Sequence, residues 1–231
     1  MATLTGIQAH AQRLVQLATP PALLRVDSFW HRWRTAHAAL EPDVEWLGKA
    51  GWTLPMWLQP HAAHELRHRT GDLDRAFLRY YERNRGEKLH ALLGELERSP
   101  GLRPWRRLLR EAVAAFGERR YSIVIPALLI TIEGAVSRAT RQLRKDRTDV
   151  KGAASRKSQN TRLPMRRLVW ISIHAFLQVV FGKSRFSGKR PQIVNRHWVA
   201  HGRGTGRWSK RECVRLFHAL HTIAVTVDRP R

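Results

Sequence analysis

The sequence predicts an all-α fold, and three observations lead to this prediction. Apolar residues recur at helical spacing in several segments, whereas no segment shows the alternation of apolar and polar residues that is typical of a half-buried strand. Pro and Gly separate these segments at intervals that suit helices joined by loops. The chain has 231 residues, of which 43% are hydrophobic, so it is long enough to bury a core of packed helices.

The first hundred residues are predicted to form helices that Pro and Gly interrupt. We expect the first two helices over residues 4–17 and 29–47, the second of them rich in Trp. A longer helix begins near Asp72 or Asp74, which are both good N-caps, and stops at the Ser-Pro-Gly sequence of residues 99–101. Its apolar stripe consists of Leu89, Leu92, Leu93 and Leu96. The Trp side chains are interpreted as core residues, with a base-stacking surface as the alternative.

Residues 101–231 contain further apolar segments at helical spacing. The predicted helices cover residues 105–116, 121–143 and 168–181 and a final segment that starts at Ser209. Pro126 is compatible with the second of these helices only because it lies near the start. In the final helix, Ser209 and Glu212 fit the capping box, in which the Glu side chain reaches back to the cap. Cys213 falls on the apolar stripe of this helix and is interpreted as a buried small hydrophobic residue.

Charge divides the chain into a near-neutral part, residues 1–100, and a basic part, residues 101–231. The whole chain carries 42 Lys and Arg against 18 Asp and Glu, a formal net charge of +24. The second part holds 29 of the basic residues and 7 of the acidic ones, so nearly the whole excess lies there. An excess this large repels itself in the folded state, and the phosphates of nucleic acid are its usual partner. We therefore predict a helical N-terminal region followed by a basic helical domain.

Two polar, basic segments of the second part are predicted to be loops. Residues 146–167 lack apolar periodicity, and we interpret them as a flexible loop that orders on a phosphate backbone or simply as a solvated surface loop. Residues 182–191, GKSRFSGKRP, form the second loop. The side chains expected to contact nucleic acid are Arg156 and Lys157 in the first loop and Lys189 and Arg190 in the second.

The composition also excludes several classes of protein. A single Cys excludes an intramolecular disulfide framework and a Cys-rich zinc module. The first residues lack the basic-then-apolar order of a secretory signal. The best apolar run, residues 123–132, is about half the length of a membrane span. We therefore expect a cytoplasmic protein that has no membrane partner and needs no cofactor.

The densest group of polar side chains lies in residues 195–207, NRHWVAHGRGTGR. It combines two imidazoles and three guanidiniums with a Gly-rich stretch whose backbone amides could approach phosphate closely. On an ideal helix, Arg196 and His201 would point about 140° apart. They converge only if the helix ends near His201, which Gly202 would permit, or if the long Arg side chain wraps round. The same Arg-x4-His spacing also occurs at Arg32/His37 and at Arg85/His90.

Two further side chains have open interpretations at this point. His197 and His201 are four residues apart and share a helix face, a spacing that can bind zinc. Because a catalytic zinc needs a third ligand and no His-Glu-x2-His pattern is present, we predict no metal site here. Glu133 lies inside the apolar segment 121–143, where a carboxylate has either a structural partner or a role in a site.

The Arg-polar-x3-His sequence, followed by a capped final helix in an all-α domain, resembles the HEPN superfamily of ribonucleases. The string Asn-Arg-His-x3-His-Gly-Arg is similar to that of bacterial proteins near this superfamily, and the resemblance covers roughly residues 101–231. It implies a metal-independent endoribonuclease in which His201 is the general base on a ribose 2′-OH and Arg196 stabilises charge on the phosphate. Supporting roles are implied for Asn195, His197 and Glu133, and phosphate contacts for Arg203 and Arg207.

The resemblance also has implications for partners and biological role. HEPN nucleases usually pair their motifs across a dimer, which implies a homodimer with a composite cleft. Basic nucleases that act as toxins or phage-defence effectors need an antitoxin or an activating partner. Two alternatives stay open: a nucleic-acid-binding helical module without catalysis, for which the basic part alone suffices, and a structural or interaction protein.

Overall fold

The structure is a computed structural model of the chain, and it describes residues 35–69, 71–140, 150–161, 163–203 and 208–228. Every regular element in those ranges is a helix, which confirms the predicted all-α fold. The chain forms two compact units, Met1–Ala39 and Leu40–Arg231. Residue 100, where the net charge changes, lies inside the second unit, to which the following description applies. The predicted helix over residues 4–17 lies outside the described residues.

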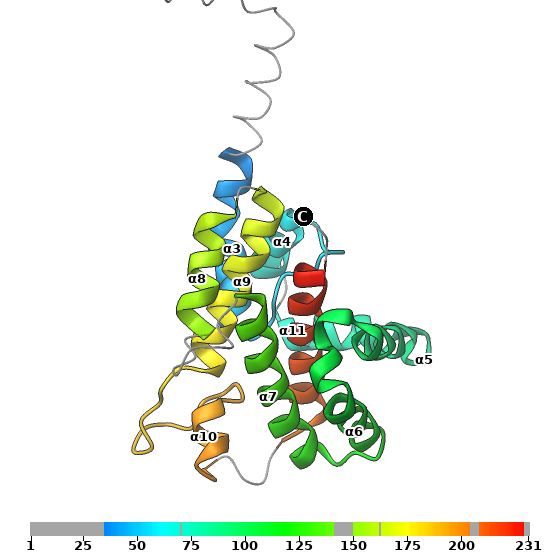
Figure 1. Cartoon of the computed structure of the whole chain (residues 1–231). Coiled ribbons are helices and arrows are strands. Elements are labelled where there is room, and N and C mark those ends of the chain that lie inside the picture. The colour runs from blue at the N-terminus through cyan, green and yellow to red at the C-terminus, as the bar shows by residue number, and fades with distance from the viewer. Residues whose placement is uncertain (1–34, 70, 141–149, 162, 204–207, 229–231) are drawn as a thin grey trace, which may run out of the picture. The chain divides into compact units, whose positions relative to one another are not determined.

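The helices of the second unit are packed around three apolar ones, α7, α9 and α11 (Figure 1). α7 packs against α6 and α11, whereas α9 packs against α3 and α8. The elements in chain order are α3 (Glu41–Lys49), α4 (Pro60–Arg69), α5 (Leu73–Arg98), the 3-10 helix η1 (Pro100–Trp105), α6 (Arg106–Gly117), α7 (Tyr121–Ala139), α8 (Val150–Asn160), α9 (Pro164–Val180), α10 (Arg196–Ala200) and α11 (Lys210–Asp228).

α7 is the most apolar helix of the unit. By length and composition it could cross a membrane, whereas the best apolar run within it, residues 123–132, is only about half as long as a span. In the fold, 56% of its apolar window is buried, against α6 and α11 among others. Pro126 lies in the second turn, close to the start, as predicted. Packing in the core therefore accounts for just over half of this apolar window, while Ile123 and Ile130 are exposed.

α5 contains a sharp bend that the sequence analysis did not predict. Asp72 is its N-cap, with a side chain that accepts a hydrogen bond of 3.0 Å from the Arg75 backbone N–H, and its predicted leucine stripe is buried. The bend lies at residues 84–86, where Asn84, Arg85 and Gly86 have φ of 52°, 57° and 81°. Left-handed backbone of this kind cannot continue a right-handed helix. The predicted single helix is thus two helical segments.

The prediction of a loop over residues 146–167 is wrong for the residues that the structure describes. α8 occupies half of this range, and α9 begins at Pro164. One face of α8 is buried against α9, but the side chains on it are small: Val150, Ala153, Ala154 and Ser158. Small side chains differ little in hydrophobicity from the residues around them. The helical spacing of this buried face is therefore hard to recognise in the sequence.

The Trp residues of the first hundred positions have different environments. Trp52 is fully buried, stacks on Phe77 with ring centroids 4.3 Å apart, and donates a hydrogen bond of 2.8 Å to Asp74. Trp57 is exposed and stacks on Tyr80. The core interpretation is therefore confirmed for Trp52, whereas Trp57 lies on the surface.

The start of α11 confirms the predicted link between Ser209 and Glu212. The backbone N–H of Ser209 donates a hydrogen bond of 2.9 Å to Glu212, and the Ser209 hydroxyl donates to the same oxygen. Burial alone would raise the pKa of the Glu212 carboxyl, but these hydrogen bonds and Arg211 lower it. Cys213 is fully buried, and burial raises the pKa of its thiol to about 12, so it is a core residue as predicted.

Candidate catalytic and nucleic-acid-binding site around α10

Asn195 fixes the position of α10 and uses every hydrogen-bonding group of its side chain. Its Oδ1 accepts hydrogen bonds from the backbone N–H of His197 and of Trp198, at 3.1 and 3.3 Å. Its Nδ2 donates to the carbonyls of Val179 and Gly182, both at 2.9 Å. Because these carbonyls lie at the end of α9, one buried amide caps α10 and ties it to α9. The structure makes Asn195 a positioning residue.

Arg196 and Glu133 form an ion pair between α10 and α7. The guanidinium Nη2 lies 3.2 Å from the Glu133 carboxylate, and both side chains are partly exposed. Glu133, which lies on the mostly apolar α7, therefore has a charged partner. That partner is Arg196 of α10, the Arg of the predicted motif. A guanidinium carries five N–H donors, so this contact does not use up its capacity to bind an anion.

Phe186 lies at the centre of a group of rings formed by α10 and the loop of residues 182–191. Its ring stacks on His197, with centroids 4.7 Å apart and planes 9° from parallel. His201 meets the His197 ring edge-on at 4.6 Å and the Phe186 ring at 5.4 Å. The Arg203 guanidinium lies 5.2 Å from the Phe186 centroid. Phe186, His201 and Arg203 are exposed, so the group faces solvent.

α10 ends at His201, as the sequence requires if the side chains of Arg196 and His201 are to converge. His201 is the C-cap, and Gly202 follows with φ of 66°, a conformation that glycine adopts at little cost. The two catalytic candidates still do not meet: in the described part of the chain, no hydrogen bond or ion pair joins Arg196 to His201. A ligand would have to bridge them. We refer to five side chains of this site as the α10 cluster: Phe186, Arg196, His201 and Arg203, which are exposed, and His197, which is half-buried.

A cleft of about 200 Å³ adjoins the α10 cluster, between α10 and the start of α11. Its walls include the indoles of Trp198 and Trp208 and the guanidiniums of Arg190 and Arg211. The Nε1 atom of Trp198 is buried and has no hydrogen-bond partner among the described residues. Aromatic faces combined with guanidiniums suit a nucleobase and its phosphate.

The other residues predicted to contact nucleic acid do not all lie near α10. Lys189 and Arg190 are exposed in the loop that carries Phe186, and Arg190 also lines the cleft between α10 and α11. Arg156 and Lys157 lie on α8, which packs against α9 and α7 rather than on α10. Arg207 falls outside the described residues. The structure therefore groups the basic side chains of the second predicted loop, but not those of the first, with the motif.

Phe186 was not among the site residues predicted from the sequence. The available signal was one aromatic residue in an otherwise polar, basic loop, where nothing in the core requires it. Its stacking on His197 depends on how the loop folds back over α10, which local spacing does not specify. Sequence reasoning could therefore mark Phe186 as unusual but could not assign it to the α10 cluster.

Potential metal ligands lie close together at two places in the described part of the chain. His197 and His201 are in ring contact, but no third ligand joins them in the described ranges. A group of three potential ligands is present on α3 and α4, formed by Asp43, His64 and His68. The i, i+4 spacing of the two His was visible in the sequence, whereas Asp43 comes from a different helix.

No family model, curated protein or solved structure matches this chain. The function therefore has to be inferred from the geometry and charge of the α10 cluster, together with the sequence motif.

Proposed function

We propose that this protein is a metal-independent endoribonuclease of HEPN type that cleaves RNA at the α10 cluster. The observation that carries the proposal is the arrangement of the two imidazoles, His197 and His201, in ring contact at a solvent-facing surface with guanidiniums beside them. Cleavage of a phosphodiester requires groups that transfer protons and cations that stabilise the charge on the phosphate, and both must be accessible to the substrate.

The proposed reaction is an internal transfer at phosphorus. His201 takes the proton of a ribose 2′-OH, and the 2′ oxygen attacks the adjacent phosphorus as the bond to the 5′ oxygen breaks. The products are a 2′,3′-cyclic phosphate and a 5′-hydroxyl. His197 is the nearest imidazole to His201 and is suited to protonate the leaving 5′ oxygen. Arg196, oriented by Glu133, stabilises the negative charge that builds on the phosphate.

The surroundings of the α10 cluster suit a single strand of RNA. Phe186 is exposed, and a base can stack on its ring in place of the Arg203 guanidinium that lies over it; base–aromatic stacking contributes about 1–3 kcal/mol per base. The adjoining cleft with Trp198 and Trp208 has room for a second base. Lys189 and Arg203 supply positive charge for the flanking phosphates.

A second function, binding of nucleic acid without cleavage, is favoured by one specific observation. Arg196 is paired with Glu133, and His201 contacts His197 and Phe186, so the two motif residues are not brought together by the described contacts. The basic charge of residues 101–231 suffices for binding through phosphate contacts alone.

We further propose that the active form is a homodimer. Ile123 and Ile130 are seven residues apart on α7, so they lie on one face of this helix, and they are 51% and 57% exposed. Glu133, one turn further along, contacts Arg196 of the α10 cluster. A dimer that covers the two isoleucines would bring two α10 clusters near its interface, which fits the composite cleft implied by the resemblance.

Cleavage of a mixed RNA pool in excess EDTA tests the catalytic proposal. We expect wild type to produce ends with 2′,3′-cyclic phosphate, and His201→Ala to lower the rate about 10²–10⁴-fold, because a positioned acid–base group is lost. His201 is exposed, so this substitution should leave the circular dichroism spectrum unchanged.

His90→Ala is the matched control. His90 is also exposed and also follows an Arg by five positions, but it lies on α5, away from the α10 cluster. Its variant should cleave as wild type does. Equal cleavage by His201→Ala and wild type would contradict the proposal, whereas salt-dependent RNA binding without cleavage by wild type would support the binding function instead.

A further inference from the structure

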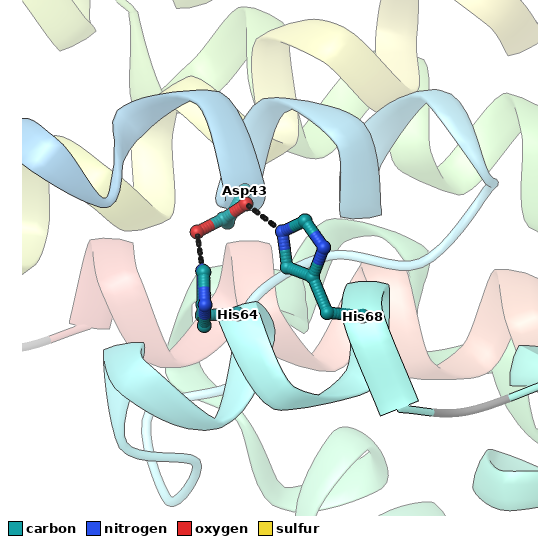
Figure 2. Close-up of side chains that lie close together, drawn as sticks. All are labelled: Asp43, His64 and His68. Carbon is teal, nitrogen blue, oxygen red and sulfur yellow. Dashed lines mark hydrogen bonds and ion pairs between the residues drawn. The ribbon is translucent and has the colours of Figure 1, made fainter.

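We infer that Asp43, His64 and His68 form a Zn²⁺-binding site that fastens α4 to α3. This site is separate from the α10 cluster and does not depend on the proposed cleavage of RNA. The three side chains meet where α4 packs against α3, and Figure 2 shows the Asp43 carboxylate between the two imidazoles.

The distances between the candidate ligand atoms are close to those that a metal ion imposes. His64 Nδ1 lies 2.8 Å from one oxygen of Asp43, and His68 Nε2 lies 3.8 Å from the other. All three ligand atoms lie within 4.8 Å of one another. Tetrahedral Zn²⁺ with bonds of about 2.0–2.2 Å holds its ligand atoms about 3.4 Å apart, so shifts of side-chain rotamers alone can produce the bound geometry.

The helices preposition this set of ligands. His64 and His68 are four residues apart on α4, so their side chains lie on the same face and their rings are in contact, with centroids 4.4 Å apart. Asp43 lies in the first turn of α3, and its side chain is only 7% exposed. The two imidazoles are 58% and 54% exposed, so an ion can reach them from solvent. The Asp43 carboxylate is already held in place, so this ligand loses little conformational entropy when the ion binds.

The chemistry of the donors selects the class of metal. Two imidazoles and one carboxylate are ligands of zinc and of other first-row transition metals, whereas Mg²⁺ and Ca²⁺ prefer oxygen donors. Three protein ligands leave the fourth position of a tetrahedral ion to water, which the exposure of the imidazoles permits.

Arg67 competes with the ion for Asp43. Its guanidinium lies 3.0 Å from the Asp43 oxygen that faces His68 and partly neutralises the carboxylate in the metal-free protein. Its side chain is more than one third exposed and sits at the edge of the site, so it can turn to solvent when the ion binds. Removal of this competitor, as in Arg67→Gln, should therefore tighten rather than weaken Zn²⁺ binding.

The site would serve to fix α4 in place. Among the described side chains of α4, Ala63 is fully buried and Leu66 only partly, so apolar packing holds this helix weakly. Polar contacts of Asp43 with His64 and Arg67 also join α4 to α3. A metal ion shared by α3 and α4 would stabilise the docked state, because it binds the folded form and not the unfolded chain.

Titration of the full-length protein with ZnCl₂ tests this inference. The protein is first treated with EDTA, the chelator is removed, and binding is followed by calorimetry and by thermal unfolding. We expect a site with one Zn²⁺ per chain and a higher Tm in the presence of Zn²⁺. His64→Ala and, separately, His68→Gln should each weaken this site at least about 10-fold, because even loss of a residue that only supports a ligand costs about 10–100-fold.

Zn²⁺ could also bind at the other close pair of imidazoles, His197 and His201. The double variant His197→Ala/His201→Ala is therefore the matched control. This double variant should retain the site and the rise in Tm. Wild type that binds no Zn²⁺, or binding that is equal in wild type, His64→Ala and His68→Gln, would overturn the inference. Both substituted imidazoles are more than half exposed, and unchanged circular dichroism spectra verify that the variants are folded.

Discussion

Asn195 shows how a single side chain assembles a site from parts that are distant in the sequence. Its amide satisfies two N–H groups at the start of α10 and two carbonyls at the end of α9. It thereby holds in position the short helix that carries His197 and ends at His201, although it lies too deep to contact RNA itself. A helix of five residues is not stable alone, so this anchoring determines where the imidazoles lie.

His218 is buried, and its two hydrogen bonds require a neutral imidazole. Its Nε2 donates to the carbonyl of Thr53 at 2.8 Å, and its Nδ1 accepts from the Tyr81 hydroxyl at 2.6 Å. A neutral imidazole fits both partners, since one ring nitrogen donates and the other accepts. The pKa of His218 is lowered to about 3, mainly because the imidazole is buried; the hydrogen bond to Thr53 opposes this shift, and the charge of His221 contributes to it.

The depressed pKa of His218 predicts that the protein becomes less stable in mild acid. The unfolded chain takes up this proton near pH 6.5 and the native state only near pH 3, so the stabilisation is complete above pH 6.5 and is lost as the pH falls toward 3. In urea unfolding between pH 6 and pH 4, the contribution is up to about 1.4 kcal/mol per pH unit. His218→Gln should be less stable at pH 7 but should show a flatter dependence on pH. Parallel pH profiles of the two proteins would rule this origin out.

At the scale of helices, Gly48 permits the close contact of α3 and α9. A Cβ atom at this position would lie 2.4 Å from the Ser172 carbonyl oxygen and 2.6 Å from the Ala175 Cβ. Backbone and Cβ atoms cannot move away as the end of a long side chain can, so the helices would have to separate. This contact is among the most extensive between helices in the unit, and it holds α3, which carries Asp43, against the core.

Gly48→Ala is therefore predicted to destabilise the protein by about 1–3 kcal/mol, although Ala is the better helix former. Gly117→Ala is the control, because Gly117 ends α6 and a Cβ there would meet nothing within 4 Å. The control should be neutral or more stable by up to about 1 kcal/mol. The midpoints of urea unfolding measure both effects, and an equal response of the two variants would show that the α3–α9 contact is not limiting.

At the scale of the whole molecule, the exposed face of α7 predicts self-association. Ile130→Glu places a charge on the proposed interface, and a charge that loses its water without a partner opposes association. Light scattering during gel filtration should report twice the 26.7 kDa chain mass for wild type and the single chain mass for this variant. Leu163→Glu is the control, since Leu163 is equally exposed but precedes α9. A monomeric wild type would remove the proposed dimer.

The sequence by itself determined the helical architecture and the location of the positive charge. Apolar periodicity and helix caps act within one or two turns, so the leucine stripe of α5, the Ser209–Glu212 link and the burial of Cys213 follow from local pattern. The end of α10 at His201 likewise follows from Gly202. Where the local contrast is weak, as on the small-residue face of α8, the pattern predicted a loop instead of a helix.

Only the tertiary structure decided which side chains from different helices meet. Glu133 pairs with Arg196, and Asp43 lies between His64 and His68, although 20 or more residues separate the partners in each case. Phe186 likewise stacks on His197. These contacts depend on the angle and distance at which whole helices and loops pack. Those quantities are set by many apolar contacts at once, and no spacing within a single segment records them.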